Sequence, residues 1–481
     1  MTQSRDRAIV LGGSIAGTLA ARVLADSYRE VLVVDRDRLH GVREPRRGAP
    51  HNVHAHGLLA RGQEIMEELF PGITEELVGT GVPTYDLGEI HWYFHNRRVQ
   101  LAHTGLLAVA ARRPVLEAHL RDRVAALPNV VYLEQHDILQ PQATEDGSRI
   151  TGVQVRRQAD GPDAAPQTLE ADLVVDATGR GSRTPAWLEQ LGYQRPEEER
   201  IRIGLGYTTR HYRMPRSSPA IHVIPFAGHH RGAFFAPVGP DTYIVSLTGM
   251  FGDHSPTDHE GFEAFLRSLD VPDIAEALRN AEPIDQPARF AFPASVRRRF
   301  ERLAAFPDGL LVMGDAVASF SPVYGQGMSV AALQALTLRA HLARPGRPSS
   351  AAYFKDIAAV VDLPWEMSAG GDLAYPEAEG PRPPKVRFFN AYMARLQRAA
   401  SKDPKVTEVL MRVAGLLDPP QALLMPGILL RVLIGGFLRP AVPQPVAPPS
   451  TDRAADLPAD VPAAVSTPIR PEPTPAAPPQ T

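Results

Sequence analysis

The chain has 481 residues and contains no cysteine. This absence excludes disulfides, thiolate metal sites, cysteine-ligated iron–sulfur clusters and thiol catalysis. Lysine is also scarce: the chain has four, Lys355, Lys385, Lys402 and Lys405. No apolar run has the length of a membrane span, and the polar start, Met1–Arg7, does not resemble a signal peptide. We therefore expect a cytoplasmic protein.

Charge and length narrow the class of protein further. The net charge of −3 predicts no basic footprint for nucleic acid and no polybasic membrane patch. Hydrophobic residues make up 44% of the chain, enough for a large core. At this length, two or three domains are expected.

The first forty residues predict a strand–helix–strand unit. Ala8 to Gly12 is a short apolar run typical of a buried parallel strand, and Val31 to Asp35 is a second one. Between them, Ile15 to Asp26 has apolar residues at helical spacing. Later, between Ile201 and Met250, short alternating strands predict a mostly antiparallel sheet inserted into an α/β protein.

The turn between the first strand and its helix carries a glycine-rich motif. It reads Gly12-Gly13-Ser14-Ile15-Ala16-Gly17, which matches G-x-G-x-x-G except that Ser14 replaces the second glycine. Glycine permits the tight turn and close helix packing, and the helix N-terminus then faces a pyrophosphate. Asp35 ends the second strand 18 residues after Gly17, where it can accept a hydrogen bond from an adenosine ribose and disfavours a 2′-phosphate.

A second motif lies far downstream. A buried strand delivers Gly314-Asp315, and a loop through Pro322 enters a helix at Gly325-Gln326-Gly327-Met328. A helix N-terminus with two glycines can seat a polar ring edge or a phosphate. Asp315 at the strand end can reach the hydroxyls of a ribityl chain.

Together these motifs resemble the FAD-dependent aromatic-hydroxylase superfamily over roughly residues 7 to 345. Its G-D-x6-P-x-x-G-Q-G motif is matched by the second motif, and its arginine near the flavin is matched by Arg113. The strings HAHGLL, DATGRGSRTPAWL and VYGQGM look most like bacterial secondary-metabolism hydroxylases and polyether-pathway epoxidases.

The resemblance implies an α/β fold: a glutathione-reductase-type Rossmann FAD domain with an inserted, mostly antiparallel substrate sheet and a helical C-terminal region. The expected parts are a discontinuous FAD-binding domain at 1–85, 105–190 and 295–345, a substrate-binding domain at 86–104 and 191–294, a helical region at 346–439, and a disordered Pro/Ala-rich tail at 440–481, which holds 13 prolines.

The resemblance and the motifs also imply a set of cofactor-contacting residues. The residues predicted to bind FAD are Gly12, Gly13, Ser14, Ala16, Gly17, Asp35, Arg36, Arg113, Ile138, Gly179, Asp315, Pro322, Gly325, Gln326, Gly327 and Met328. Catalytic side chains stay unassigned, because the chemistry would take place on the flavin.

The activity implied is a monooxygenase. Reduced FAD would react with O2 to give a C4a-hydroperoxide, which passes one oxygen atom to a lipophilic secondary metabolite by alkene epoxidation or hydroxylation. The alternative is an FAD-dependent reductase or dehydrogenase acting on a prenyl or polyketide chain; a non-catalytic FAD-binding protein is a third reading. NAD(P)H would be the electron source. Thr178 replaces the acid that the superfamily uses with NAD(P)H, so a separate flavin reductase is an expected partner.

Other residues leave alternatives open. His51, His54 and His56 could contact flavin or substrate, or lie in a solvated loop; no suitable carboxylate is near in sequence, and we expect no metal site. The aromatic residues on the inserted strands could line a substrate pocket or belong to the core. The residues predicted to line the pocket are His54, His56, Trp92, Phe94, Phe226, Phe235 and Tyr243.

Two further features bear on activity and location. The W-x-W-x-I-P signature of flavin halogenases is absent, and no lysine precedes position 355, which disfavours halogenation. The apolar stretch at 422–438 is either a helix packed on the FAD domain or a weak peripheral membrane contact.

Overall fold

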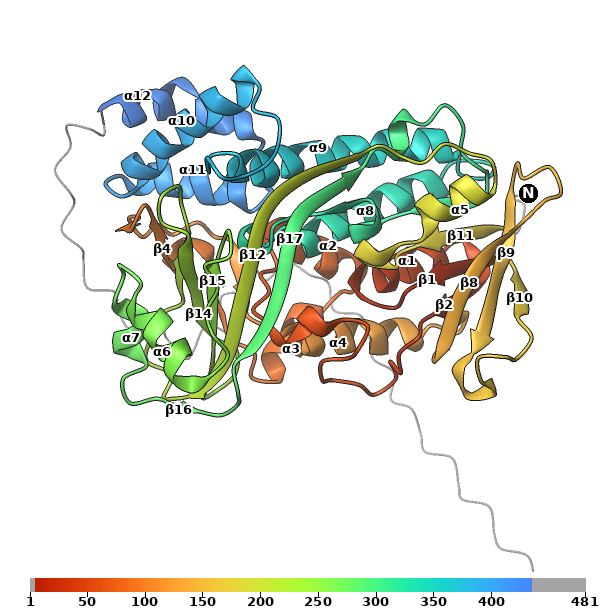
Figure 1. Ribbon diagram of the computed structural model, residues 1–481, viewed down its shortest axis with the longest axis horizontal. Helices are drawn as coiled ribbons and strands as arrows, with labels where there is room; N and C mark the ends of the chain where they lie inside the picture. The colour runs from red at the N-terminus through yellow and green to blue at the C-terminus, as the bar shows by residue number, and fades with distance from the viewer. Residues whose placement is uncertain (1–4, 435–481) are drawn as a thin grey trace, which may run out of the picture. The chain divides into compact units, whose positions relative to one another are not determined.

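A five-stranded parallel sheet forms the centre of one part of the molecule (Figure 1). The computed structural model describes residues 5–434, which lie in one compact unit. The strand order is β18-β11-β1-β2-β7. These strands are β1 (Arg5–Leu11), β2 (Tyr28–Val34), β7 (Val130–Leu133), β11 (Leu173–Asp176) and β18 (Leu310–Val312).

Both faces of the parallel sheet are covered, which explains why its strands are continuous apolar runs. Val10 packs on the side of α1 and α8, whereas its neighbour Ile9 packs toward Ile150 and Trp187 on the other side. The helices of this part are α1 (Ile15–Ala25), α2 (Ala60–Leu69), α3 (Ile73–Gly79), α4 (Arg113–Ala125), α5 (Thr184–Gln190) and α8 (Gly327–Leu342).

A three-stranded antiparallel sheet covers one side of the parallel sheet. Its strands are β8 (His136–Ala143), β9 (Ile150–Arg157) and β10 (Gln167–Glu170), in the order β10-β9-β8. Ile138, predicted to contact FAD, lies on β8, where it packs against the apolar cluster of this layer.

The inserted sheet is mostly antiparallel, as expected; of its strand pairs, β13 with β4 is parallel. The order is β19-β17-β12-β15-β14-β13-β4-β5, with β16 paired to β12. The strands are β4 (His91–Phe94), β5 (Arg97–Arg98), β12 (Glu198–Arg213), β13 (Ile221–Val223), β14 (Arg231–Pro237), β15 (Thr242–Gly249), β16 (Glu282–Pro283), β17 (Ala288–Arg298) and β19 (Ala318–Ser319). A separate two-stranded antiparallel sheet consists of β3 (Thr84–Asp86) and β6 (Leu107–Val109).

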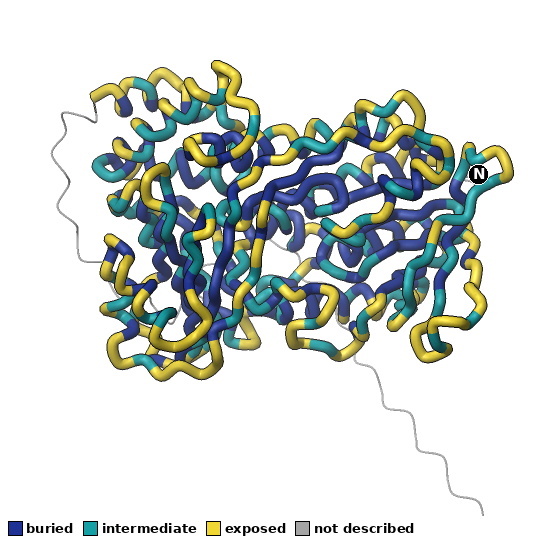
Figure 2. Tube along the Cα trace, viewed as in Figure 1, coloured by how far each residue is buried: buried dark blue, intermediate teal, exposed yellow. Residues whose placement is uncertain are grey.

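Two long strands of the inserted sheet, β12 and β17, connect it with the part of the molecule around the parallel sheet (Figure 1). They reach from the small helices α6 (His259–Arg267) and α7 (Asp273–Ala277) to the helices over the parallel sheet. Figure 2 shows that burial is concentrated along the parallel sheet and the middle of these two strands.

Helices α9 (Ser350–Asp372), α10 (Pro384–Ala400), α11 (Pro404–Ala414) and α12 (Pro426–Ile434) follow the last strand. They confirm the predicted helical C-terminal region. Residues 435–439 of that region and the predicted tail at 440–481 lie outside the described residues. No helix among residues 5–434 is long and apolar enough to cross a membrane. The domain boundaries remain a prediction from the sequence.

Candidate functional site

The glycine-rich turn has the backbone that its motif requires. Gly12 has φ +95°, and a Cβ there would lie 2.8 Å from the carbonyl oxygen of Ala177. A Cβ at Gly17 would lie 1.7 Å from the carbonyl oxygen of Gly12, so α1 can approach β1 only with glycine here. Among the described residues, none accepts a hydrogen bond from the N–H groups of Ile15 or Ala16. The N-terminus of α1 therefore offers free donors to an anion.

Asp35 lies at the end of β2, beside this turn. It is buried, and its Oδ2 accepts from the backbone N–H of Gly13 at 2.7 Å while Oδ1 accepts from that of Asp37 at 2.8 Å. The Arg46 guanidinium lies 3.7 Å from Oδ2. Arg36, the next residue in the chain, is exposed. Asp35 thus links the glycine-rich turn to the end of β2 by a hydrogen bond. It also lies where an acceptor for the ribose hydroxyl is expected.

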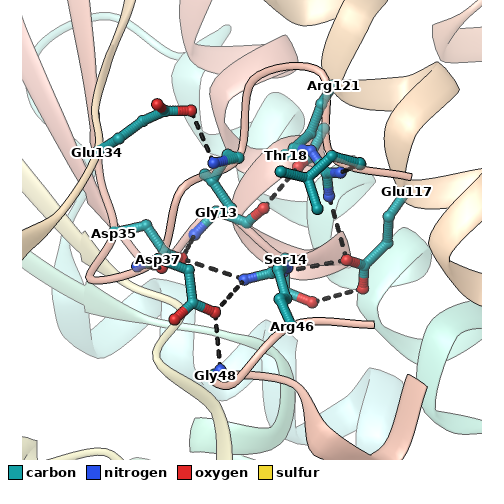
Figure 3. Close-up of polar contacts among 12 residues, drawn as sticks. Gly13, Ser14, Thr18, Asp35, Asp37, Arg46, Gly48, Glu117, Arg121 and Glu134 are labelled. Atoms are coloured by element: carbon teal, nitrogen blue, oxygen red, sulfur yellow. Dashed lines mark hydrogen bonds and ion pairs between the residues drawn. The ribbon is translucent and has the colours of Figure 1, made fainter. Parts of the chain in front are cut away.

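A buried ion cluster centres on Glu117 of α4 (Figure 3). Its Oε1 accepts from Ser14 Oγ at 2.7 Å and Arg113 Nε at 2.9 Å. Its Oε2 accepts from Arg46 Nη2 at 3.0 Å and Arg121 Nη1 at 3.2 Å. Burial alone would raise the pKa of Glu117, but the arginines and the Ser14 hydroxyl hold it well below its usual range. Glu117 is ionised and ties the glycine turn to α4.

The second motif meets the first at Gly314. This residue has φ +67°, and a Cβ there would lie 2.7 Å from the Cβ of Ala16. The next residue, Asp315, is half-buried, and among the described residues it accepts no side-chain hydrogen bond. A Cβ at Gly327 would lie 3.9 Å from its Oδ1, and one at Gly179 would lie 4.0 Å from its Cβ. The structure therefore brings together Ala16, Gly179, Asp315 and Gly327, all of which were predicted to bind FAD.

Two opposing influences act on the pKa of Asp315. Burial raises its pKa, whereas the guanidinium groups of Arg113 and Arg180 oppose the shift. Beyond it, Gln326 is buried at the start of α8, and its Oε1 has no hydrogen-bond partner among the described residues. Unpartnered groups here and at α1 fit a polar ligand that spans both helix starts.

The rest of the second motif lies between α8 and the preceding loop. Gly325 has φ +64° and faces Gly57, since a Cβ there would lie 3.8 Å from the Gly57 Cα. Gly57 belongs to the loop that carries His51, His54 and His56, called the histidine loop below. Pro322 is exposed at the start of the short helix η7 (Pro322–Tyr324), and Met328 is buried in the main core. Met328 therefore supports α8, and a contact from it to a cofactor would come through its backbone.

The histidine loop packs against the inserted sheet. His54 Nδ1 is 2.8 Å from Thr209 Oγ1, and its ring meets that of Tyr207 edge-on with centroids 4.6 Å apart. The His51 ring lies 5.6 Å from that of His56. Burial, reinforced by Arg113, lowers the pKa of His51 to about 2 and that of His56 to about 3.

All three imidazoles are therefore neutral at physiological pH. For His54, burial and the nearby His211 lower the pKa to about 4. Within residues 5–434 no group of three or more His, Cys, Asp or Glu is arranged to hold a metal ion.

The predicted aromatic residues divide between the two faces of the inserted sheet. Trp92 and Phe94 stack with centroids 6.3 Å apart and pack toward α10 and α11. Phe226 stacks on His229 at the sheet margin, 4.5 Å between centroids. Phe235 and Tyr243 are fully buried against α6 and α7, so the pocket-lining role is corrected for these two: they are core. Side chains alternate along a strand, and these two point away from the histidine loop.

Sequence reasoning missed several residues here. Glu117 could have been found, because Arg113 and Arg121 lie four residues to either side of it on one helix face. Asp372, at the end of α9, accepts from the Tyr324 hydroxyl at 3.2 Å. It is fully buried, which raises its pKa to about 8. No local pattern in the sequence marks it.

Comparison with known proteins defines the class. The protein-family profile described as "FAD binding domain" matches residues 6–351. Protein Rv3254 of Mycobacterium tuberculosis (strain ATCC 25618 / H37Rv) is 34% identical over 437 residues, 86% of this chain and 90% of that protein.

Solved structures share the fold at low identity. The flavin-dependent brominase Bmp2 aligns with TM-score 0.62 and 14% identity, over 85% of this chain and 92% of its own. PqsL of Pseudomonas aeruginosa, described as a probable FAD-dependent monooxygenase, aligns with TM-score 0.55 and 18% identity over 84% of this chain and 98% of its own. A flavoprotein/dehydrogenase from Cytophaga hutchinsonii aligns with TM-score 0.63 and 13% identity, over 90% and 100%.

The chain therefore belongs to the FAD binding domain family, a family of FAD-dependent oxidoreductases of the monooxygenase type. This confirms the resemblance to the aromatic-hydroxylase superfamily and the predicted fold class.

Proposed function

We propose that this protein is an FAD-dependent monooxygenase that inserts one oxygen atom from O2 into a lipophilic secondary metabolite. One observation carries the proposal. The starts of α1 and α8, which carry the two motifs, lie close to a group of buried imidazole and aromatic rings. Asp315 and Gly325 lie at one side, and His51, His54 and Tyr207 lie at the other.

The residues present fit FAD. The free N–H groups at the start of α1 suit a pyrophosphate, and Asp35 suits the adenosine ribose. Asp315 suits the ribityl hydroxyls, and the start of α8 at Gln326 suits the polar edge of the ring, where the helix dipole favours negative charge. FAD bound here would supply the reaction with O2.

The histidine and aromatic side chains near the two motifs suit a substrate that reacts without losing a proton. Imidazoles with conjugate-acid pKa values of about 2 to 4 are weak bases, so they would not remove a phenolic proton efficiently. Their role would be to exclude water and orient the substrate beside Tyr207 and Phe290, whose rings lie 5.6 Å apart. This favours alkene epoxidation over phenol hydroxylation.

The electron donor is proposed to be NAD(P)H acting through a separate flavin reductase. The Thr178 hydroxyl, at the position of the superfamily's acid, donates to Asp176 Oδ1 at 2.6 Å and is occupied by that contact. Anaerobic mixing with NADPH tests this: reduction of the bound flavin should be slow alone and fast after a flavin reductase is added. Rapid reduction by NADPH alone would contradict it.

Oxygen activation is tested by stopped-flow. The FAD-loaded protein is reduced anaerobically with dithionite and mixed with oxygenated buffer. The expected result is a transient absorbance distinct from both oxidised and reduced flavin. Direct return to oxidised flavin, with candidate alkenes present, would instead support the second candidate, an FAD-dependent reductase or dehydrogenase acting on a prenyl or polyketide chain.

A further inference from the structure

The last described helix, α12, is apolar on both its inner and its outer side. Ile428 and Val432 are buried against the neighbouring helices. On the opposite side Leu430 is 57% exposed and Leu433 69% exposed. A helix that packs on a protein by one face usually carries polar residues on the other.

These exposed residues continue into the preceding turn. Leu424 is the last residue of the short helix η8 (Pro420–Leu424), and Met425, which is 60% exposed, lies between η8 and α12. We define the C-terminal apolar patch as Leu424, Met425, Leu430, Leu433 and Ile434. Contiguous exposed apolar side chains of this kind mark an interaction surface.

A basic surface borders the C-terminal apolar patch. Residues 384–434 hold eight Lys or Arg and three Asp or Glu, a net charge of +5, although the whole chain has −3. Arg395, Arg398 and Lys402 have no ion-pair partner among residues 5–434 and lie on or just after α10. Positive charge is thus concentrated on these helices.

Two contacts hold α12 and the turn before it against α10. The Tyr392 hydroxyl in the middle of α10 donates to the carbonyl of Leu423 at 2.5 Å. Further along, Arg431 Nη1 of α12 lies 2.6 Å from Asp403 Oδ2, just after α10 ends. Helix α12 therefore runs beside the C-terminal half of α10, as Figure 1 shows, so the exposed Leu430 and Leu433 belong to the helix next to the one that carries Arg395 and Arg398.

We propose that this face binds the surface of an anionic phospholipid bilayer. Apolar side chains that enter the acyl boundary, flanked by arginine and lysine at headgroup level, are the pattern of an interfacial helix. The basic residues add attraction to anionic lipid. A second copy of the chain fits poorly, because a two-fold interface would place the same positive charges against each other.

Vesicle flotation of the full chain tests the proposal. We expect binding to phosphatidylglycerol–phosphatidylcholine vesicles, at least tenfold weaker binding to pure phosphatidylcholine, and loss of binding in high salt. The double variant Leu430→Ser/Leu433→Ser should bind at least tenfold more weakly. Its matched control is Ile284→Ser, which removes an apolar side chain that is 41% exposed on the inserted sheet.

The charge is tested separately. Arg395→Glu/Arg398→Glu should also lower binding at least tenfold, whereas Arg216→Glu, a change at an exposed arginine in the loop between β12 and β13, should not. No binding of the wild type to either vesicle would overturn the proposal, as would equal binding by the patch variants. A wild-type dimer that becomes monomeric in Leu430→Ser/Leu433→Ser would overturn it too, and would assign the patch to self-association.

Discussion

Glu117→Gln removes the carboxylate on which three largely buried arginine side chains converge. Glu117 is 2% exposed and pairs with Arg46, Arg113 and Arg121 at 2.9 to 3.2 Å. Breaking a buried ion pair by removing one partner costs about 3–5 kcal/mol, because the other charge stays buried. Arg46 also lies 3.3 Å from Asp37, which compensates it in part. We therefore expect a loss near the lower end, about 3 kcal/mol.

The assay is equilibrium unfolding in urea, followed by circular dichroism, since urea does not screen charge. Glu366→Gln is the matched control: Glu366 pairs with Lys385 at 2.7 Å, but both side chains are more than half exposed. An exposed pair contributes about 1 kcal/mol or less. If Glu117→Gln lowered the free energy of unfolding by no more than the control does, the reasoning would be refuted.

The same variant has a signature in pH. The arginines hold the folded-state pKa of Glu117 below the ordinary value of about 4.3. A depressed carboxyl pKa contributes stability that is present above the unfolded value and is lost as pH falls toward the folded one. The stability gap between wild type and Glu117→Gln should be full at pH 7 and narrow below about pH 4.3.

Three further predictions concern Gly17, Asp372 and His54. Gly17→Ala should abolish or strongly weaken FAD retention on gel filtration, because its Cβ would lie 1.7 Å from a backbone oxygen; Gly79→Ala, which meets no atom within 4 Å, should retain it. Burial raises the pKa of Asp372 to about 8, so wild type should lose stability as pH rises from about 4 to 8, and Asp372→Asn should not share that part of the loss in thermal melts. A pH-independent difference would contradict this. Burial lowers the pKa of His54 to about 4, so its contribution should be present above about 6.5 and lost on acidification to 4; imidazole NMR signals of His54 that titrate near 6.5 would contradict this.

The sequence predicted the parallel sheet well, because its strands are buried on both faces. Ala8 to Gly12 and Ile15 to Asp26 match β1 and α1 within a few residues. The three-stranded sheet was harder. Strand β8 is polar, contains Pro141 and is fully buried at no residue, so its pattern resembles a loop.

The sequence predicted the motifs of the candidate site, but not which side chains face it or which distant residues contact it. Period-two alternation separates Phe234 from Phe235, yet only packing decides which of them faces α6 and α7. Asp372 reaches Tyr324 across 48 residues of chain, and nothing local encodes that contact. Long-range contacts of this kind lie beyond pattern reasoning on one sequence.

The departures from the superfamily pattern have a common physical basis. At Ser14 the family has glycine, and at Thr178 it has an acid. In the structure the Ser14 hydroxyl donates to Glu117 and that of Thr178 donates to Asp176, both buried carboxylates. A buried carboxylate is costly unless hydrogen-bond donors surround it. Each substitution thus supplies a donor where this chain has an interior acid, and the glycine turn keeps its shape because Ser14, unlike Gly12, has an ordinary extended φ of −86°.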